Sequence, residues 1–202
     1  MELWSELATL HTRLDALKHP FYLRWQAGEL TRPELADYAG QYRHAVVALA
    51  DASDRAAELD PALRAHAVEE REHVTLWDGF LTAMGGDACA PARAGTLACA
   101  TAWAGADDRA LVPTLAALHA IESTQPGVSK TKRAGLVERY GVTPGPATAY
   151  FELHETRDAQ HAADARERLE RLATPADEPA IVAETERVLG GYLALLDGVT
   201  AA

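Results

Sequence analysis

Three residues with metal-binding side chains lie close together in the last third of the chain: His154, Asp158 and His161. Their spacing of four and then three residues places all three on one face of a helix. That face is also apolar, since it continues through Phe151, Ala162, Ala165, Leu169 and Leu172. Two imidazoles and a carboxylate buried there would lack partners, and a metal ion would satisfy all three. Hydrogen-bonded core histidines are the alternative.

A second group lies on an apolar helical face farther upstream, where Glu70 is followed three residues later by His73. Helical bundles use Glu-x-x-His pairs to offer a carboxylate and an imidazole to one metal of a dinuclear site. His66 lies one heptad before His73, so we expect it beside the site, with direct ligation as the alternative. Glu69 and Glu72 are expected to face solvent.

A third carboxylate, Glu122, continues the apolar face that contains Leu115 and Leu118. A surface position at a helix end is the alternative, and His119, one turn earlier, is a candidate hydrogen-bond partner. Nitrogen and oxygen ligands without sulfur suit iron or manganese. Six ligands exceed the need of one ion that must also bind a substrate, so the count favours two metals. The six candidates are Glu70, His73, Glu122, His154, Asp158 and His161.

Helices must position these residues, because alanine and leucine dominate and apolar residues recur every three or four positions. We expect one all-α domain over residues 1–202, a bundle of about seven to eight helices. Thr31 with Glu34, Asp60 with Pro61, and Gly85 carry start and stop signals. Besides a short helix at 21–26, the expected helices cover about 3–19, 33–59, 61–84, 94–103, 107–121, 130–139, 147–172 and 178–196.

The composition excludes several classes of protein. The net charge of −11 repels phosphate, so we expect no nucleic-acid or anionic-membrane partner. The first residues lack the pattern of a signal peptide, and no stretch is apolar enough to span a membrane. Cys89 and Cys99 form no CxxC motif or disulfide framework, and we expect both to be buried and the protein to be cytoplasmic.

The chain resembles the haem-oxygenase-like dimetal oxidases, which share their helical bundle with thiaminase II and pyrroloquinoline quinone synthase. The segments that carry the resemblance are HPFYLRWQAGEL, LADYAGQYRHAV, EEREHVTLW, IESTQPGVSKTKRAGLVERYG and YFELHETRDAQHA. The last is the most specific, because HxxxDxxH follows a helical glutamate by about thirty residues, as in the family. The resemblance implies that the six candidates bind metal. It also implies a carboxylate from the preceding core helix, where this chain offers Gln41, with His44 one turn later.

The resemblance further implies two Fe(II) ions per chain, the second held more weakly, with O2 as co-substrate. The implied reaction is N-oxygenation or oxidative C–C cleavage of a small amine-like or amino-acid-like substrate in secondary metabolism. Trp77, Tyr150 and Phe151 are candidate pocket walls, with core packing as the alternative. Lys132 is expected to be solvated, with a pocket role as the alternative.

Three further expectations accompany the resemblance. In one branch of the family a lysine and a tyrosine of the enzyme are consumed as substrate, and Lys132 keeps that possibility open. We expect a homodimer, to whose seam the leucines near the N-terminus could contribute. The alternatives are a metal-free enzyme of the same fold, thiaminase-like or oxidase-like, and a non-enzymatic helical interaction protein.

Overall fold

The computed structural model describes residues 2–106 and 108–200, and the regular secondary structure among these residues is entirely helical, with no strand. Two short 3-10 turns, Ala16–Lys18 and Pro61–Leu63, precede α2 and α4. The helices are α1 Glu2–Arg13, α2 Pro20–Ala27, α3 Arg32–Leu59, α4 Arg64–Met84, α5 Ala94–Ala104, α6 Leu111–Glu122, α7 Gln125–Glu138, α8 Ala149–His154, α9 Arg157–Leu172 and α10 Glu178–Thr200.

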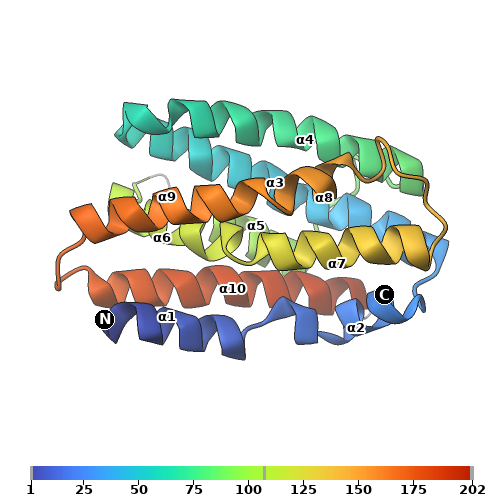
Figure 1. The fold of residues 1–202 in the computed structure, drawn as a ribbon, viewed down its shortest axis with the longest axis horizontal. Helices are drawn as coiled ribbons and strands as arrows, with labels where there is room; N and C mark the ends of the chain where they lie inside the picture. Colours follow the sequence, from blue (N-terminus) through green and yellow to red (C-terminus); the bar gives the residue numbers. More distant parts are fainter. Residues whose placement is uncertain (1, 107, 201–202) are drawn as a thin grey trace.

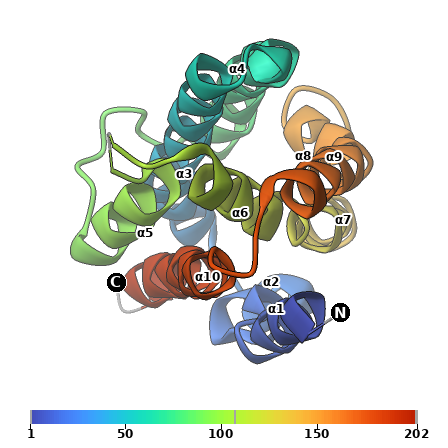
Figure 2. The ribbon, with the colours of Figure 1, turned by 90° about the vertical axis from the view of Figure 1, so that its left-hand side faces the viewer.

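The helices run nearly parallel or antiparallel along the long axis of the molecule (Figure 1). Seen end-on, α6 lies in the middle of the bundle, with α3, α9 and α10 packed around it (Figure 2). This helix is apolar on nearly every side, which is the pattern of a helix buried within a protein. Its last residue, Glu122, is therefore carried into the interior rather than onto the surface.

The predicted start and stop signals are found at three helix ends. The Thr31 hydroxyl and the Glu34 side chain form a capping box at the start of α3. Asp60 Oδ1 accepts from the Ala62 amide at 3.0 Å and begins the 3-10 turn before α4. Gly85 ends α4 in the left-handed region, with φ of 79°. These local signals define the long α3–α4 hairpin.

The structure corrects the predicted boundaries of several helices. The first helix ends at Arg13 because Asp15 caps a separate 3-10 turn. Helix α7 begins at Gln125 rather than near 130, because Pro126 fits the first turn of a helix. The predicted helix 147–172 is interrupted at residues 155–156. The described residues therefore form ten α-helices rather than seven or eight.

The two cysteines differ from each other in their surroundings. Cys99 is buried on α5, as expected, whereas Cys89 is exposed in the loop after α4, so the expectation for Cys89 was wrong. Within residues 2–106 and 108–200, every helix is too short or too polar to cross a lipid bilayer.

A close contact between α2 and α7 fixes the position of one segment of the core. The Trp25 indole is fully buried and donates a hydrogen bond from Nε1 to the Lys132 carbonyl at 3.1 Å. The ring lies against Gly135, where a Cβ atom would approach the indole Cδ1 to 2.6 Å. Because the side chain of Gly135 is only a hydrogen atom, α7 can pack directly on Trp25.

We expect Gly135→Ala to lower the free energy of unfolding by about 1–3 kcal/mol, because the new methyl group displaces a fully packed indole. Gly127→Ala is the matched control on the same helix, since its Cβ would meet only Leu17 at 3.7 Å. This control should be neutral or stabilise by up to about 1 kcal/mol through helix propensity. Urea unfolding of both variants tests the contact, and equal stabilities would contradict it.

Candidate metal centre

Four helices bring the six predicted ligands together in the interior. Helix α4 supplies Glu70 and His73, α6 supplies Glu122, α8 supplies His154, and α9 supplies the other two. None of the six side chains lies on the surface, because every one of these residues is at most 7% exposed. The residues are Glu70, His73, Glu122, His154, Asp158 and His161. The sequence-predicted set therefore converges on one buried region between α4, α6, α8 and α9.

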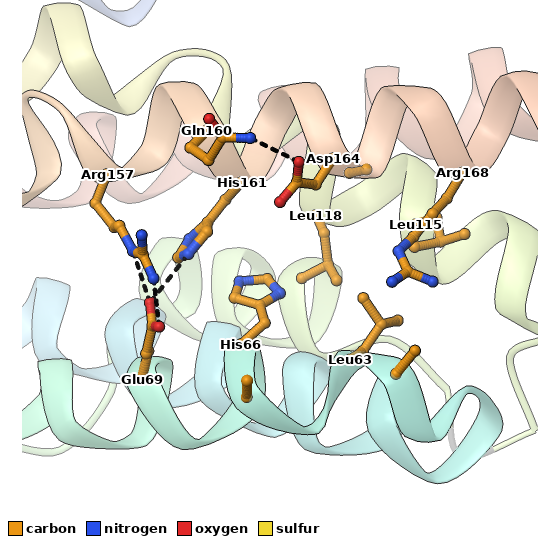
Figure 3. A pocket seen from close by; sticks show the side chains of 13 residues that line it. Leu63, His66, Glu69, Leu115, Leu118, Arg157, Gln160, His161, Asp164 and Arg168 are labelled. Atoms are coloured by element: carbon orange, nitrogen blue, oxygen red, sulfur yellow. Dashed lines mark hydrogen bonds and ion pairs between the residues drawn. The ribbon is translucent and has the colours of Figure 1, made fainter.

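One group of ligand atoms within this region comes from His66, Glu70, Glu122 and His161, and these atoms lie within 4.8 Å of one another. His66 Nε2 is 2.8 Å from Glu122 Oε1, and His161 Nδ1 is 3.5 Å from Glu70 Oε1. His66 and His161 point toward each other from α4 and α9 (Figure 3), with ring centroids 4.2 Å apart. Two imidazoles and two carboxylates therefore surround one point.

A second group comprises Glu70, His73 and His154. His73 Nδ1 is 3.1 Å from Glu70 Oε1, and the His73 and His154 ring centroids are 4.5 Å apart. Asp158 Oδ1 lies 4.0 Å from His154 Nε2, so this carboxylate borders the second group. Glu70 belongs to both groups, which is the arrangement expected of a carboxylate shared between two metals.

Several inward-facing polar atoms of this region make no hydrogen bond within the described residues, although some of them lie at ion-pair distance from one another. The unpartnered buried atoms are His66 Nε2, Glu70 Oε1, His73 Nδ1, both Glu122 oxygens, His154 Nε2, Asp158 Oδ2 and His161 Nδ1. Leaving so many buried polar atoms unpaired is costly. Two cations with nitrogen and oxygen ligands would pair them, and this donor set suits iron or manganese. The residues present therefore fit a dinuclear centre.

The titration behaviour of the cluster reflects the crowding of charge in a dry site. Burial would raise the pKa of Glu70, but the neighbouring imidazoles of His161, His66 and His73 hold it well below its usual range. Burial raises the pKa of Asp158 well above its usual value, and it lowers the pKa of His154 to about 4. Burial and like-charge repulsion therefore disfavour the ionised carboxylate of Asp158 and the protonated imidazole of His154. Bound cations would favour ionised carboxylates and neutral imidazoles here.

The structure assigns different surroundings to the three remaining near-site candidates. The Gln41 amide donates to the Pro91 carbonyl and accepts from Thr96 Oγ1 at 2.6 Å, so it holds the loop before α5 rather than a metal. His44 Nε2 bonds to the Ala90 carbonyl of the same loop at 2.9 Å. His119 packs edge-on against Trp4 on the side of α6 that faces α1. These three residues do not join either group.

Two residues of α4 differ from their predicted roles. His66 contributes a ligand atom to the first group, although a place beside the site was expected. Burial would lower the pKa of His66, but the Glu122 and Glu70 carboxylates raise it to about 10. Glu69, expected to face solvent, bonds to His161 Nε2 at 3.2 Å. The heptad spacing of His66 and His73 was a usable signal for His66, whereas the contact of Glu69 depends on α9.

Lys132 is fully buried, which corrects the expectation of a solvated side chain. Its Nζ atom has no hydrogen-bond partner in the described part of the chain, and burial lowers the pKa of the amine well below its usual value. Five aromatic rings surround this atom at 4.1 to 5.6 Å from their centroids: Tyr22, Tyr38, Tyr42, Trp77 and Phe151. We call this enclosure the lysine chamber.

The predicted pocket aromatics form the wall between the lysine chamber and the metal ligands. Trp77 and Phe151 are two of the five rings of the lysine chamber. Trp77 also packs edge-on against Tyr150, with ring centroids 4.9 Å apart. Tyr150 in turn stacks on the His154 ring at 3.8 Å. Both the wall and the chamber are buried. Packed aromatic side chains thus connect the amine to the candidate metal centre, from Trp77 through Tyr150 to His154.

A hydrogen-bonded chain of phenols includes two tyrosines of the lysine chamber. The Tyr22 hydroxyl is 2.8 Å from the Tyr38 hydroxyl and 2.5 Å from that of Tyr192. Burial raises the pKa of all three phenols well above the usual value, so they remain protonated at neutral pH. Polar atoms therefore line the chamber without offering Lys132 a negative charge.

Comparisons with known proteins place these observations in context. The profile of a protein family described as iron-containing redox enzymes matches residues 43–192. A 4-aminobenzoate synthase of Nitrosomonas europaea is 30% identical over 91% of this chain and 85% of its own. A 4-aminobenzoate synthase of Chlamydia muridarum is also 30% identical, over 96% of this chain and 89% of its own.

Solved structures share the arrangement of helices at lower identity. A domain with a heme oxygenase-like fold from Shewanella denitrificans is 18% identical, with a TM-score of 0.77 over 99% of this chain and 89% of that one. A TenA homologue from P. horikoshii is 11% identical, with a TM-score of 0.76 over 98% and 96%. The predicted haem-oxygenase-like helical fold is therefore confirmed.

We expect metal-binding variants to separate the two groups. Glu70→Ala should abolish binding of both metals, because this carboxylate is shared, whereas His66→Ala should reduce the count from about two ions per chain to about one. His44→Ala is the control, since His44 bonds only to a loop carbonyl. Elemental analysis after anaerobic Fe(II) loading gives the counts, and an unchanged count in Glu70→Ala would contradict the shared site.

We expect Lys132→Met to stabilise the metal-free protein at pH 7. The amine is neutral in the fold but protonated in the unfolded chain, so unfolding takes up a proton and wild-type stability rises with pH by about 1.4 kcal/mol per unit. The advantage of the variant should therefore shrink as the pH approaches the usual lysine value of 10.5. Urea unfolding at pH 7 and pH 9.5 measures the difference, and a pH-independent difference would refute a neutral amine.

Proposed function

This chain belongs to the family of iron-containing redox enzymes, and from that premise we propose that it is an O2-dependent dinuclear iron enzyme that forms 4-aminobenzoate. The observation that carries the proposal is the buried, unpartnered amine of Lys132 beside the candidate metal centre. The family makes the chain an oxidoreductase. The proposal adds the identity of its product and the residues that supply the nitrogen and the ring of that product.

In the proposed centre, two imidazoles and one carboxylate would hold each ion, and Glu70 lies within reach of both groups. One set is His66, His161 and Glu122, and the other is His73, His154 and Asp158. Bound iron would supply the redox chemistry by which O2 is reduced. The protein residues hold the ions, balance their charge and keep the site dry, which limits side reactions of reactive oxygen species.

Lys132 is the proposed nitrogen source. A reaction at an amine needs the lone pair of the neutral form, and burial in the lysine chamber favours that form. An ordinary surface lysine would be protonated at neutral pH and would lack this lone pair. The absence of a carboxylate partner within the described residues fits an amine held for reaction rather than for an ion pair.

A tyrosine of the same chamber is the proposed source of the ring. The product named for the relatives carries an amino group and a carboxylate para to each other on a benzene ring. Tyrosine carries an oxygen and a carbon substituent in the same para relation. Tyr22, Tyr38 and Tyr42 all present their rings within 5.6 Å of Lys132 Nζ. The chamber therefore holds both chemical components next to each other.

One observation favours a second candidate, oxidation of a free amine or amino acid that enters from solvent. An opening of about 510 Å³ lies beside His73 between α4 and α8, and its lining includes Thr75, Leu76 and Leu153. This largely apolar opening would admit a small substrate with an alkyl part to the second group of ligands. The reaction in that case is N-oxygenation or C–C cleavage of the entering molecule.

Isotope labelling of the protein tests the first proposal. Metal-free protein produced with 15N-lysine is loaded with Fe(II) and exposed to O2 and a reductant, and small products are analysed by mass spectrometry. We expect 15N-labelled 4-aminobenzoate at no more than about one molecule per chain, with a matching loss of mass from the protein. Lys132→Met should give none, and Lys130→Met, at an exposed position on the same helix, should match wild type.

The other outcomes decide against the first proposal. Labelled 4-aminobenzoate from Lys132→Met would exclude this lysine as the nitrogen source. Product that carries only the isotope of an added free amine, over many turnovers, would support the second candidate instead. Intact protein mass with no new small molecule under either condition would contradict both candidates.

A further inference from the structure

An ion pair joins Glu69 of α4 to Arg157, the first residue of α9, beside His161 (Figure 3). Arg157 donates from Nε to Glu69 Oε2 at 2.7 Å and from a terminal nitrogen to Glu69 Oε1, so the pair is bidentate. The same Oε2 atom lies 3.2 Å from His161 Nε2. Glu69 therefore bonds at once to the end of α9 and to a ring of the candidate centre.

The contact with Glu69 determines which nitrogen of His161 is free. A carboxylate can only accept, so His161 Nε2 carries the proton and Nδ1 is left with its lone pair. Nδ1 is the atom that faces Glu70 Oε1 at 3.5 Å and has no hydrogen bond. The lone pair thus points into the first group of ligand atoms.

His154 is oriented in the opposite sense by a different acceptor. Its Nδ1 atom donates to the Tyr150 carbonyl at 2.6 Å, which leaves Nε2 free to face Asp158. The backbone of its own helix supplies that acceptor. His161 instead relies on a side chain from another helix, so its orientation depends on residues that can be changed by substitution.

We propose that Glu69 is a positioning residue, which fixes the tautomer and the ring direction of His161 for metal binding, and that Arg157 holds Glu69 in place. The inference rests on the dinuclear centre of the proposed function. An acceptor on the outer nitrogen of a metal-binding histidine fixes its tautomer and raises its basicity, and its loss commonly costs about 10–100-fold in metal affinity. Neither residue is placed among the metal ligands themselves.

A neighbouring ion pair provides a matched control. Arg133 on α7 forms a bidentate pair with Glu155 at the junction between α8 and α9. The Arg133 and Arg157 side chains are 40% and 43% exposed, and neither Arg133 nor Glu155 is hydrogen-bonded to a candidate ligand side chain. Glu155→Gln therefore weakens a tether of the same segment and leaves the His161 contact intact.

The tautomer is measured in metal-free protein by 15N NMR of labelled histidines, with the His161 signals assigned by their loss in His161→Gln. We expect the Nε2-protonated form in wild type, Glu69→Gln and Glu155→Gln, because a carbonyl or carboxylate acceptor remains in each. Glu69→Ala should give a mixture of tautomers. An unchanged His161 tautomer in Glu69→Ala would overturn the proposal.

Metal affinity is measured separately by anaerobic Co(II) titration followed by absorption. Glu69→Ala should weaken one of the two sites by about 10–100-fold, Glu69→Gln should weaken it less, and Glu155→Gln should match wild type. Equal losses of Co(II) affinity in Glu155→Gln and Glu69→Ala would show that both ion pairs act only by fastening the helices together. That result would overturn the positioning role of Glu69. Failure of wild type to bind two Co(II) ions would instead contradict the proposed centre, so the two failures are distinguishable.

Discussion

The arrangement of this bundle depends on the burial of charge around Glu70. A carboxylate that is 2% exposed must be compensated by its neighbours, and here three imidazoles from two helices surround it. Helix α4 supplies two of these rings at positions −4 and +3 relative to Glu70, and α9 supplies the third. The apolar α6 then closes the site with Glu122. Packing and electrostatics are therefore linked, because moving any of these helices would leave a charge uncompensated.

The same requirement extends to the lysine chamber on the other side of the aromatic wall. Burial lowers the pKa of Lys132 and raises the pKa of tyrosines around it such as Tyr22, so it favours the uncharged form of each side chain. Trp77 stays fixed because its Nε1 atom donates to the Ala39 carbonyl at 2.9 Å. The cluster of candidate metal ligands and the buried amine are thus joined by packed aromatic rings.

Much of the fold and most of the site were predictable from local patterns. Periodicity and capping residues such as Thr31 identified the helices, and residue types spaced on helical faces selected six candidate ligands, all of which the fold buries. The burial of Lys132 was not predicted, because the sequence of its own helix does not show how many aromatic rings from other helices enclose the side chain. Glu69 was missed for a similar reason, since its role arises only where α4 meets α9. The interruption at 155–156 contains neither proline nor glycine, so no local signal announced it.

That interruption has a consequence for how the site can vary among related sequences. His154 belongs to α8, whereas Asp158 and His161 belong to α9, so the candidate ligands of this part of the chain lie on two helical segments rather than one. A substitution at the junction can alter the angle between these segments while α4 and α6 keep their positions. The distance between His154 and the two candidate ligands on α9 is thereby open to gradual adjustment, which a single rigid helix would not permit.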